Sequence, residues 1–268
     1  MPPIDWIRNK RIPEKTDIIL IDNSYDINYI NLDEANVLQK ESFAICMNKF
    51  ETPKIYMMTS KFYNGIVKTK DKLLEDKIFN SLEDASGVLI LEDFIIYYQI
   101  GKVKKENMHD FVIFAFTKPG KLICSAIQDA DIGREMYCHP YWREKMRELL
   151  NLDEDGANYE LTNSMFTNAV LFELFKRYAE VQIKVLAPKI NAELFRCKYY
   201  NETDHSIEIM DSTWFTELII SESFNVRGHF RLQPYGTGLK ERKLVWITDF
   251  KKKGYTRKAK MESELIHN

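Results

Sequence analysis

The stretch that decides the fold is residues 88–127, which read VLILEDFIIYYQIGKVKKENMHDFVIFAFTKPGKLICSAI. It holds three runs rich in Ile, Val, Phe and Tyr, at 88–100, 110–117 and 122–127, and short runs of this composition predict strands. Between the last two runs, Pro119 and Gly120 occupy the central positions of a predicted type II turn. Because so short a connection joins antiparallel strands, the stretch predicts a β-meander.

Helices are predicted on the C-terminal side of this meander. Residues 140–150 begin with a proline, which suits the first turn of a helix, and their apolar residues keep helical spacing. Residues 165–180, capped by Asn163 or Ser164, are apolar nearly all round and should be buried against the sheet. The acidic stretch 151–158 is expected to be a loop. The predicted class is therefore α+β, a central antiparallel sheet packed by helices.

The N-terminal part is expected to be mainly helical, apart from one short buried strand at 17–22. Asp33 and Glu34 favour the start of a helix that runs to about residue 49, because acidic side chains stabilise helix N-termini. Residues 54–80 are predicted to be helical with an interruption near Gly65. The expected organisation is one compact unit made of a helical part (1–85), an α+β core (86–226) and a basic C-terminal hairpin with its tail (227–268).

The C-terminal hairpin is the strongest chemical candidate in the chain. Residues 226–238 read VRGHFRLQPYGTG and residues 241–247 read ERKLVWI. Since strands alternate their side chains, Arg227, His229 and Arg231 should lie on one face, opposite Phe230 and Leu232. The candidate ligand-binding or nucleic-acid-binding residues are Arg227, His229, Arg231, Lys240, Arg242 and Lys243. Three roles are open for this cationic row: contact with a phosphate or carboxylate, ion pairing with the acidic body, or acid–base catalysis by His229.

Charge is distributed unevenly along the 268 residues. The net charge is only −2, but residues 227–260 hold eleven Lys or Arg and two acids, a formal charge of +9 that leaves −11 for the remainder. Such asymmetry is typical of chains that bind a polyanion, usually nucleic acid. The alternative is a solvated tail, or one that folds back on the acidic body.

Other chemistry is less supported. The chain has no P-loop, GxGxxG, HExxH or GxSxG motif, so the common nucleotide, metalloprotease and hydrolase signatures are absent. Asp129, Asp131 and Glu135 form an acidic cluster after a strand, but a solvated loop explains it better than Mg²⁺ binding. The adjacent Cys138 and His139 lack partners at zinc spacing. No catalytic residue, metal ligand or cofactor is therefore assigned.

The cellular setting expected from the sequence is the reducing cytoplasm. Four cysteines without CxxC spacing suggest free thiols rather than a disulfide framework. The N-terminus lacks the basic start and apolar run of a signal peptide, and no window resembles a membrane span. No membrane partner is expected.

The segment RGHFRLQPYGTGLKERKLVWITDF, residues 227–250, resembles an Arg-Gly-His-aromatic hairpin near the C-terminus of uncharacterised phage and plasmid proteins. It is also similar to the C-terminus of the type V-A anti-CRISPR family that targets Cas effector biosynthesis. Residues 91–100, 110–116 and 165–180 resemble that family's further strands and long apolar helix, in the same order. The chain carries Phe230 where the family has Trp, and its N-terminal portion has no counterpart there.

The resemblance implies a phage or mobile-element regulatory protein acting in the bacterial host cell. Such an anti-defence protein would recognise a host polypeptide, as a nascent chain, and promote loss of its mRNA, with RNA or the ribosome as a further partner. Peptide capture is expected at an exposed sheet edge within 88–127. The alternatives are a general RNA- or DNA-binding protein that uses the basic hairpin, a nuclease, and a virion-associated structural protein.

Overall fold

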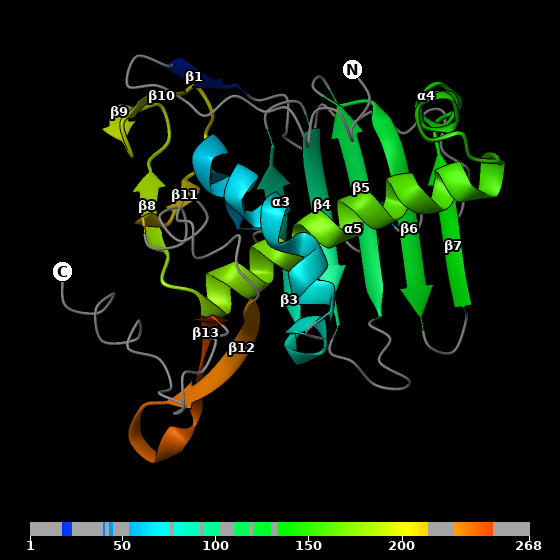
Figure 1. Ribbon diagram of the computed structural model, residues 1–268. Coiled ribbons are helices and arrows are strands. Elements are labelled where there is room, and N and C mark those ends of the chain that lie inside the picture. Colours follow the sequence, from blue (N-terminus) through cyan, green and yellow to red (C-terminus); the bar gives the residue numbers. More distant parts are fainter. Residues whose placement is uncertain are drawn as a thin grey trace, which may run out of the picture.

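The computed structural model describes residues 18–22, 40, 43–44, 54–75, 78–91, 94–101, 110–117, 120–129, 133–213 and 228–248. Its centre is an eight-stranded sheet with the order β7-β6-β5-β4-β3-β2-β11-β8 (Figure 1). The strands are β2 (Ile55–Met58), β3 (Ala85–Ile90), β4 (Phe94–Ile100), β5 (Phe111–Thr117), β6 (Leu122–Asp129), β7 (Gly133–Cys138), β8 (Gln182–Leu186) and β11 (Ile207–Asp211). The α+β class expected from the sequence is confirmed.

The meander forms the antiparallel half of this sheet. Strands β3 to β7 pair in chain order, each antiparallel to the next. Gly120, in the predicted turn between β5 and β6, has the positive φ of 82° that the second central position of a type II turn requires. The other half is mixed, because β2 pairs parallel with both β3 and β11, and β8 closes the sheet antiparallel to β11.

Helices cover one face of the sheet. They are α3 (Ser60–Glu75), the short 3₁₀ helix η3 (Ile78–Ser81), α4 (Pro140–Leu150) and α5 (Glu154–Tyr178). Helix α5 runs diagonally across the strands, and α3 packs against it on the same face (Figure 1). The apolar side chains of α5, including Phe172 and Phe175, enter one core with Tyr98 and Ile113 of the sheet. The predicted burial of residues 165–180 against the sheet is confirmed.

A second apolar cluster lies on the opposite face. Alternate residues of the same strands, such as Met57, Val88 and Phe116, pack there with Phe43 and Tyr199. Tyr199 belongs to a three-stranded sheet of β1 (Ile18–Ile21), β10 (Cys197–Asn201) and β9 (Asn191–Leu194). The strand expected at 17–22 is therefore present. Burial of both faces explains why the central strands are continuous apolar runs rather than alternating ones.

Two element boundaries differ from the sequence expectations. The acidic stretch 151–158 is not a loop, because Asp153 caps α5 and its side chain accepts a hydrogen bond of 2.7 Å from the Gly156 amide. The segment 54–80 opens with strand β2, and Gly65 does not interrupt the helix that follows. The helix expected at 33–49 lies outside the described residues except at 40 and 43–44.

Three of the four cysteines lie in the described part of the chain, and all three are buried free thiols. Cys124 on β6 and Cys138 on β7 are direct cross-strand partners. Cys197 lies on β10, and Cys46 is outside the described residues. None of the helices described here is long and apolar enough to cross a membrane.

Candidate functional site

The C-terminal hairpin consists of β12 (Gly228–Tyr235) and β13 (Glu241–Thr248), joined by the 3₁₀ turn η4 (Thr237–Leu239). The two strands are antiparallel and in register from Gly228 opposite Thr248 to Tyr235 opposite Glu241. They form a separate two-stranded ribbon that extends away from the sheet and helices (Figure 1). The predicted hairpin is confirmed.

The base of the ribbon is fixed in the core. Phe230 is 2% exposed and Trp246 is 7% exposed, and their rings meet edge to face at 4.9 Å. Lys72 of α3 lies 5.0 Å above the Trp246 ring, and its Nζ donates a hydrogen bond of 3.4 Å to the Gly228 carbonyl. A Cβ atom on Gly228 would lie 2.3 Å from Cζ2 of Trp246, so only glycine fits beneath the indole.

The side chains alternate along β12 as the sequence predicts. His229 and Arg231 are exposed, whereas Phe230 is buried between them. Cross-strand pairing places Lys243 on the face of His229 and Arg231, because Lys243 is the partner of Gln233. Arg242 is the partner of Pro234 and belongs to the opposite face, while Lys240 follows the turn.

These cations differ in their partners. Lys243 is ion-paired with Glu180, just beyond the end of α5, so the ion-pairing interpretation holds for this residue. Within the part of the chain that the structure describes, Arg231, Lys240 and Arg242 form no ion pair and are exposed. Arg227 lies outside the described residues. The ribbon thus carries three exposed cations, with Arg231 beside the buried Phe230 and with Lys240 and Arg242 near the tip, and none of them is ion-paired within the described residues.

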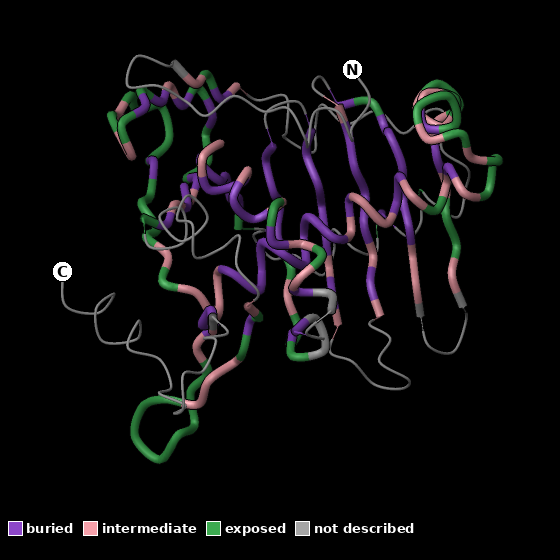
Figure 2. Tube along the Cα trace, viewed as in Figure 1, coloured by how far each residue is buried: buried purple, intermediate pink, exposed green. Residues whose placement is uncertain are grey.

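The distal end of the ribbon is exposed (Figure 2). Tyr235 is 43% exposed and Leu239 is 63% exposed. The Tyr235 hydroxyl is hydrogen-bonded to Glu241, which raises the pKa of that phenol. Three of the turn residues, Gly236, Gly238 and Leu239, have positive φ angles of 75°, 70° and 56°.

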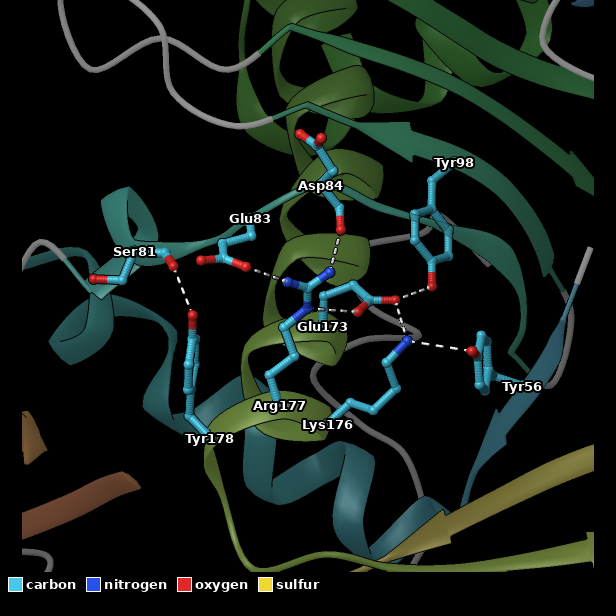
Figure 3. Close-up of polar contacts among 9 residues, drawn as sticks. All are labelled: Tyr56, Ser81, Glu83, Asp84, Tyr98, Glu173, Lys176, Arg177 and Tyr178. Atoms are coloured by element: carbon cyan, nitrogen blue, oxygen red, sulfur yellow. Dashed lines mark hydrogen bonds and ion pairs between the residues drawn. The ribbon is translucent and has the colours of Figure 1, made fainter. Parts of the chain in front are cut away.

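A polar network that the sequence did not reveal lies under α5 (Figure 3). Its centre is Glu173, which is fully buried between apolar neighbours in the sequence. Its Oε1 accepts hydrogen bonds of 2.5 Å from the Tyr98 hydroxyl and 2.6 Å from Lys176 Nζ. Its Oε2 has no hydrogen bond, but lies 3.6 Å from Arg177 Nε in an ion pair. One carboxylate therefore holds two cations of the same helix.

Two tyrosines of the sheet complete this network. Lys176 Nζ lies 4.3 Å above the Tyr56 ring and donates to its hydroxyl at 3.3 Å. Gly87 leaves room for both tyrosines, because a Cβ there would lie 2.8 Å from Tyr56 and 2.9 Å from the Tyr98 hydroxyl. Burial, with Glu173 adding to it, raises the pKa of Tyr56 and Tyr98. Burial also lowers the pKa of Lys176, in spite of the adjacent carboxylate.

The network borders an open cleft of about 610 Å³ at the ends of β3 to β6. Helix α5 contributes Glu173, Lys176 and Arg177 to its wall, and the strand ends contribute Gln99 and Gln128 among others. Arg177 is held by the Asp84 carbonyl and by Glu83, whose Oε2 lies 3.8 Å from its Nη1. The cleft also holds Asp84 and Asp110, so its wall mixes both charges and favours no single class of ion.

The acidic and sulfur candidates do not form a metal site in the described residues, where no group of three His, Cys, Asp or Glu side chains comes together. Asp131 lies outside these residues. His139 caps α4, since its Nδ1 accepts a hydrogen bond of 3.2 Å from the Tyr141 amide. Cys138 faces Cys124 and points its Sγ at the Asn158 carbonyl, 3.7 Å away. Both residues thus have local structural roles.

Comparison with known proteins yields no matching family model, no similar curated protein and no similar solved structure.

Proposed function

We propose that this protein binds nucleic acid through the cationic hairpin β12–β13. The observation that carries the proposal is the ribbon itself. Its base is anchored in the core, and the exposed Arg231 beside that base, with Lys240 and Arg242 near the tip, has no ion-pair partner among the described residues. Because the backbone of the ribbon is already folded, binding does not require it to be ordered, and each phosphate that its cations neutralise releases counterion.

Salt dependence tests the proposal. The affinities for labelled duplex DNA and for single-stranded RNA are measured by fluorescence anisotropy between about 50 and 200 mM salt. We expect a steep fall in affinity with salt. Arg231→Gln and Arg242→Gln should each reduce the slope of log affinity against log salt by about 1, because each removes about one phosphate contact.

The ribbon supplies its own matched control. Lys243 is already neutralised by Glu180, so Lys243→Gln should change the slope less than Arg231→Gln does, although the formal charge change is equal. Lys121→Gln, in the turn before β6, should leave the slope unchanged. Equal effects of all four substitutions would mean that only overall charge matters, and would contradict a role for the ribbon. Cleavage of either probe in the presence of Mg²⁺ would favour the nuclease alternative.

Recognition of a polypeptide is the second candidate, and strand β8 favours it. The prediction of an exposed sheet edge within residues 88–127 is wrong, because β3 to β6 are interior strands that are paired on both sides. The edges of the eight-stranded sheet are β7 and β8. On β8, Ile183 and Val185 are exposed, although both are apolar. An edge of this kind accepts an added peptide strand, in keeping with the host-polypeptide recognition that the anti-CRISPR resemblance implies.

A copurification experiment separates the two candidates. The tagged protein is expressed in bacteria and isolated with and without nuclease treatment. A host polypeptide that remains after nuclease and is lost in Val185→Arg would support peptide recognition at β8, because a charge on an exposed edge discourages strand addition. Bulk nucleic acid that modest salt releases would support the hairpin alone.

A further inference from the structure

The tip of the hairpin combines apolar exposure with positive charge. Leu239, at 63%, is with Val185 the most exposed large apolar residue of the described chain, and Tyr235 is 43% exposed. Lys240 follows Leu239 directly, and Arg242 is two residues further on. Phosphate contacts alone would require only the cations. The two apolar side chains therefore need a different explanation from the one that accounts for the ribbon's charge.

The backbone of the turn holds Leu239 outward. Its φ of 56° is in the left-handed region, which is unfavourable for a large side chain. The turn is closed by a hydrogen bond of 3.1 Å from the Leu239 amide to the Gly236 carbonyl. Gly236 is favoured there because its φ of 75°, with a ψ of −177°, is a backbone conformation that only glycine adopts readily. A costly conformation that presents an apolar side chain to solvent is typical of a functional contact.

The exposed part of the ribbon is long enough to reach the floor of a groove. Two strand pairs, Pro234–Arg242 and Tyr235–Glu241, lie beyond the ion pair of Lys243 with Glu180, and at about 3.4 Å per residue they extend about 7 Å before the turn is counted. The minor groove of B-form DNA is about 7.5 Å deep. The undistorted groove is only about 6 Å wide, so the tip can meet the base pairs once bending has opened the groove, with Arg242 near the backbone.

We propose that Leu239, supported by Tyr235, inserts between adjacent base pairs of duplex DNA from the minor groove and bends the duplex. This inference depends on the proposed nucleic-acid function and extends it to a substrate class. Proteins that insert apolar wedges in this way unstack a base step and widen the minor groove, and flanking cations hold the backbone. Pyrimidine–purine steps, which unstack most easily, are the preferred sites.

Two other ligands, a membrane surface and a single-stranded nucleic acid, fit the tip less well. Two side chains bury less apolar surface than a single acyl chain, which by itself gives only marginal membrane binding. Binding to single strands relies on several aromatic side chains that stack on successive bases. The exposed part of the ribbon offers one aromatic ring, that of Tyr235.

The test uses a duplex of about 20 base pairs with 2-aminopurine at a central TA step and a donor–acceptor pair at its ends. Binding of the wild-type protein should increase 2-aminopurine fluorescence, because the base is unstacked, and should raise energy transfer between the ends. Leu239→Asn is the decisive variant, since asparagine adopts positive φ readily and the turn should keep its shape. It should bind with the same salt slope but lose most of the fluorescence increase. Leu239→Met should retain it.

The outcomes distinguish this inference from the proposed function. Binding by the wild-type protein without unstacking or bending would overturn insertion and leave nucleic-acid binding intact. Absence of binding would overturn both. A fluorescence increase that persists in Leu239→Asn would exclude Leu239 as the wedge. Equal affinity for the matching single strand, or stronger binding to anionic vesicles than to the duplex, would also contradict the inference.

Discussion

Gly228 joins the ribbon to the body, and its lack of a side chain is required by contact rather than by backbone angle. We expect Gly228→Ala to destabilise the protein by about 1–3 kcal/mol, because its Cβ would overlap the Trp246 ring and force it out of place. Urea unfolding monitored by tryptophan fluorescence measures this loss. His229→Ala, at the exposed neighbouring position, is the control and should cost less than about 0.5 kcal/mol. A similar loss in both variants would contradict the close packing.

Glu173 binds two cations in a place where a charge is costly. Glu173→Gln leaves Lys176 without its carboxylate, and we expect a loss of about 2–4 kcal/mol, somewhat reduced because Lys176 is partly exposed. The double variant Glu173→Leu with Lys176→Met removes both charges and should recover part of that loss. Unfolding in urea compares the two, with Glu193→Gln on the exposed strand β9 as control. A double variant less stable than Glu173→Gln would show that the network contributes more than charge compensation.

Among the elements, helix α5 begins at the N-cap Asp153, within the acidic stretch that was expected to be a loop. We expect Asp153→Ala to lower the free energy of unfolding by about 1 kcal/mol, because the Gly156 amide loses its acceptor. Asp153→Asn keeps a side-chain oxygen in place and should restore most of the stability. Thermal unfolding followed by circular dichroism is the measurement. If alanine and asparagine behave alike, capping by Asp153 does not stabilise the helix.

The sequence predicted those elements whose pattern is long or sharply bounded. The meander, α4, the apolar part of α5 and the hairpin all carry such patterns. Residues 55–58 were misassigned because four apolar residues next to a helix have no period of their own, and only parallel pairing with β3 and β11 makes them a strand. The sheet edges could not be predicted for a similar reason, since strand order depends on contacts between distant segments.

Only the part of the candidate site that lies along a single strand, β12, could be predicted from the sequence. Alternation alone places His229 and Arg231 on an outer face and Phe230 inside. The Glu173 network joins α5 to β2 and β4, so no local pattern encodes it. One signal was present, however. A single acid between Phe172 and Leu174 in an apolar helix, followed by cations three and four residues later, indicates a buried charge with partners.

At the scale of the whole molecule, the tyrosines buried in the apolar clusters on the two faces of the sheet make the stability sensitive to high pH. Burial raises the pKa of Tyr63, Tyr98 and Tyr199. Below pH 10 these phenols are protonated in both folded and unfolded chains, so their contribution to stability is complete. Above pH 10 they ionise in the unfolded chain first, and the free energy of unfolding should fall by up to about 1.4 kcal/mol per pH unit for each tyrosine.

Thermal melting between pH 8 and 11 measures this loss, and absorbance at 295 nm follows phenolate formation in the same samples. Tyr63→Phe removes one of these ionising phenols, so the free energy of unfolding should fall less steeply with pH, by up to about 1.4 kcal/mol per pH unit. Stability that is unchanged between pH 8 and 11 would contradict the burial of these hydroxyls.

The facing thiols of Cys124 and Cys138 make the β6–β7 pair a kinetic reporter. We expect neither sulfur to react with an alkylating reagent while the two strands stay together, because both side chains are buried. Detachment of the edge strand β7 together with the helix packed over it would uncover both sulfurs in one event, whereas Cys197 belongs to a different sheet. Mass spectra taken during alkylation would then gain two adducts together rather than one at a time. The rate of that paired step would give the opening frequency of this edge of the molecule, without any engineered label.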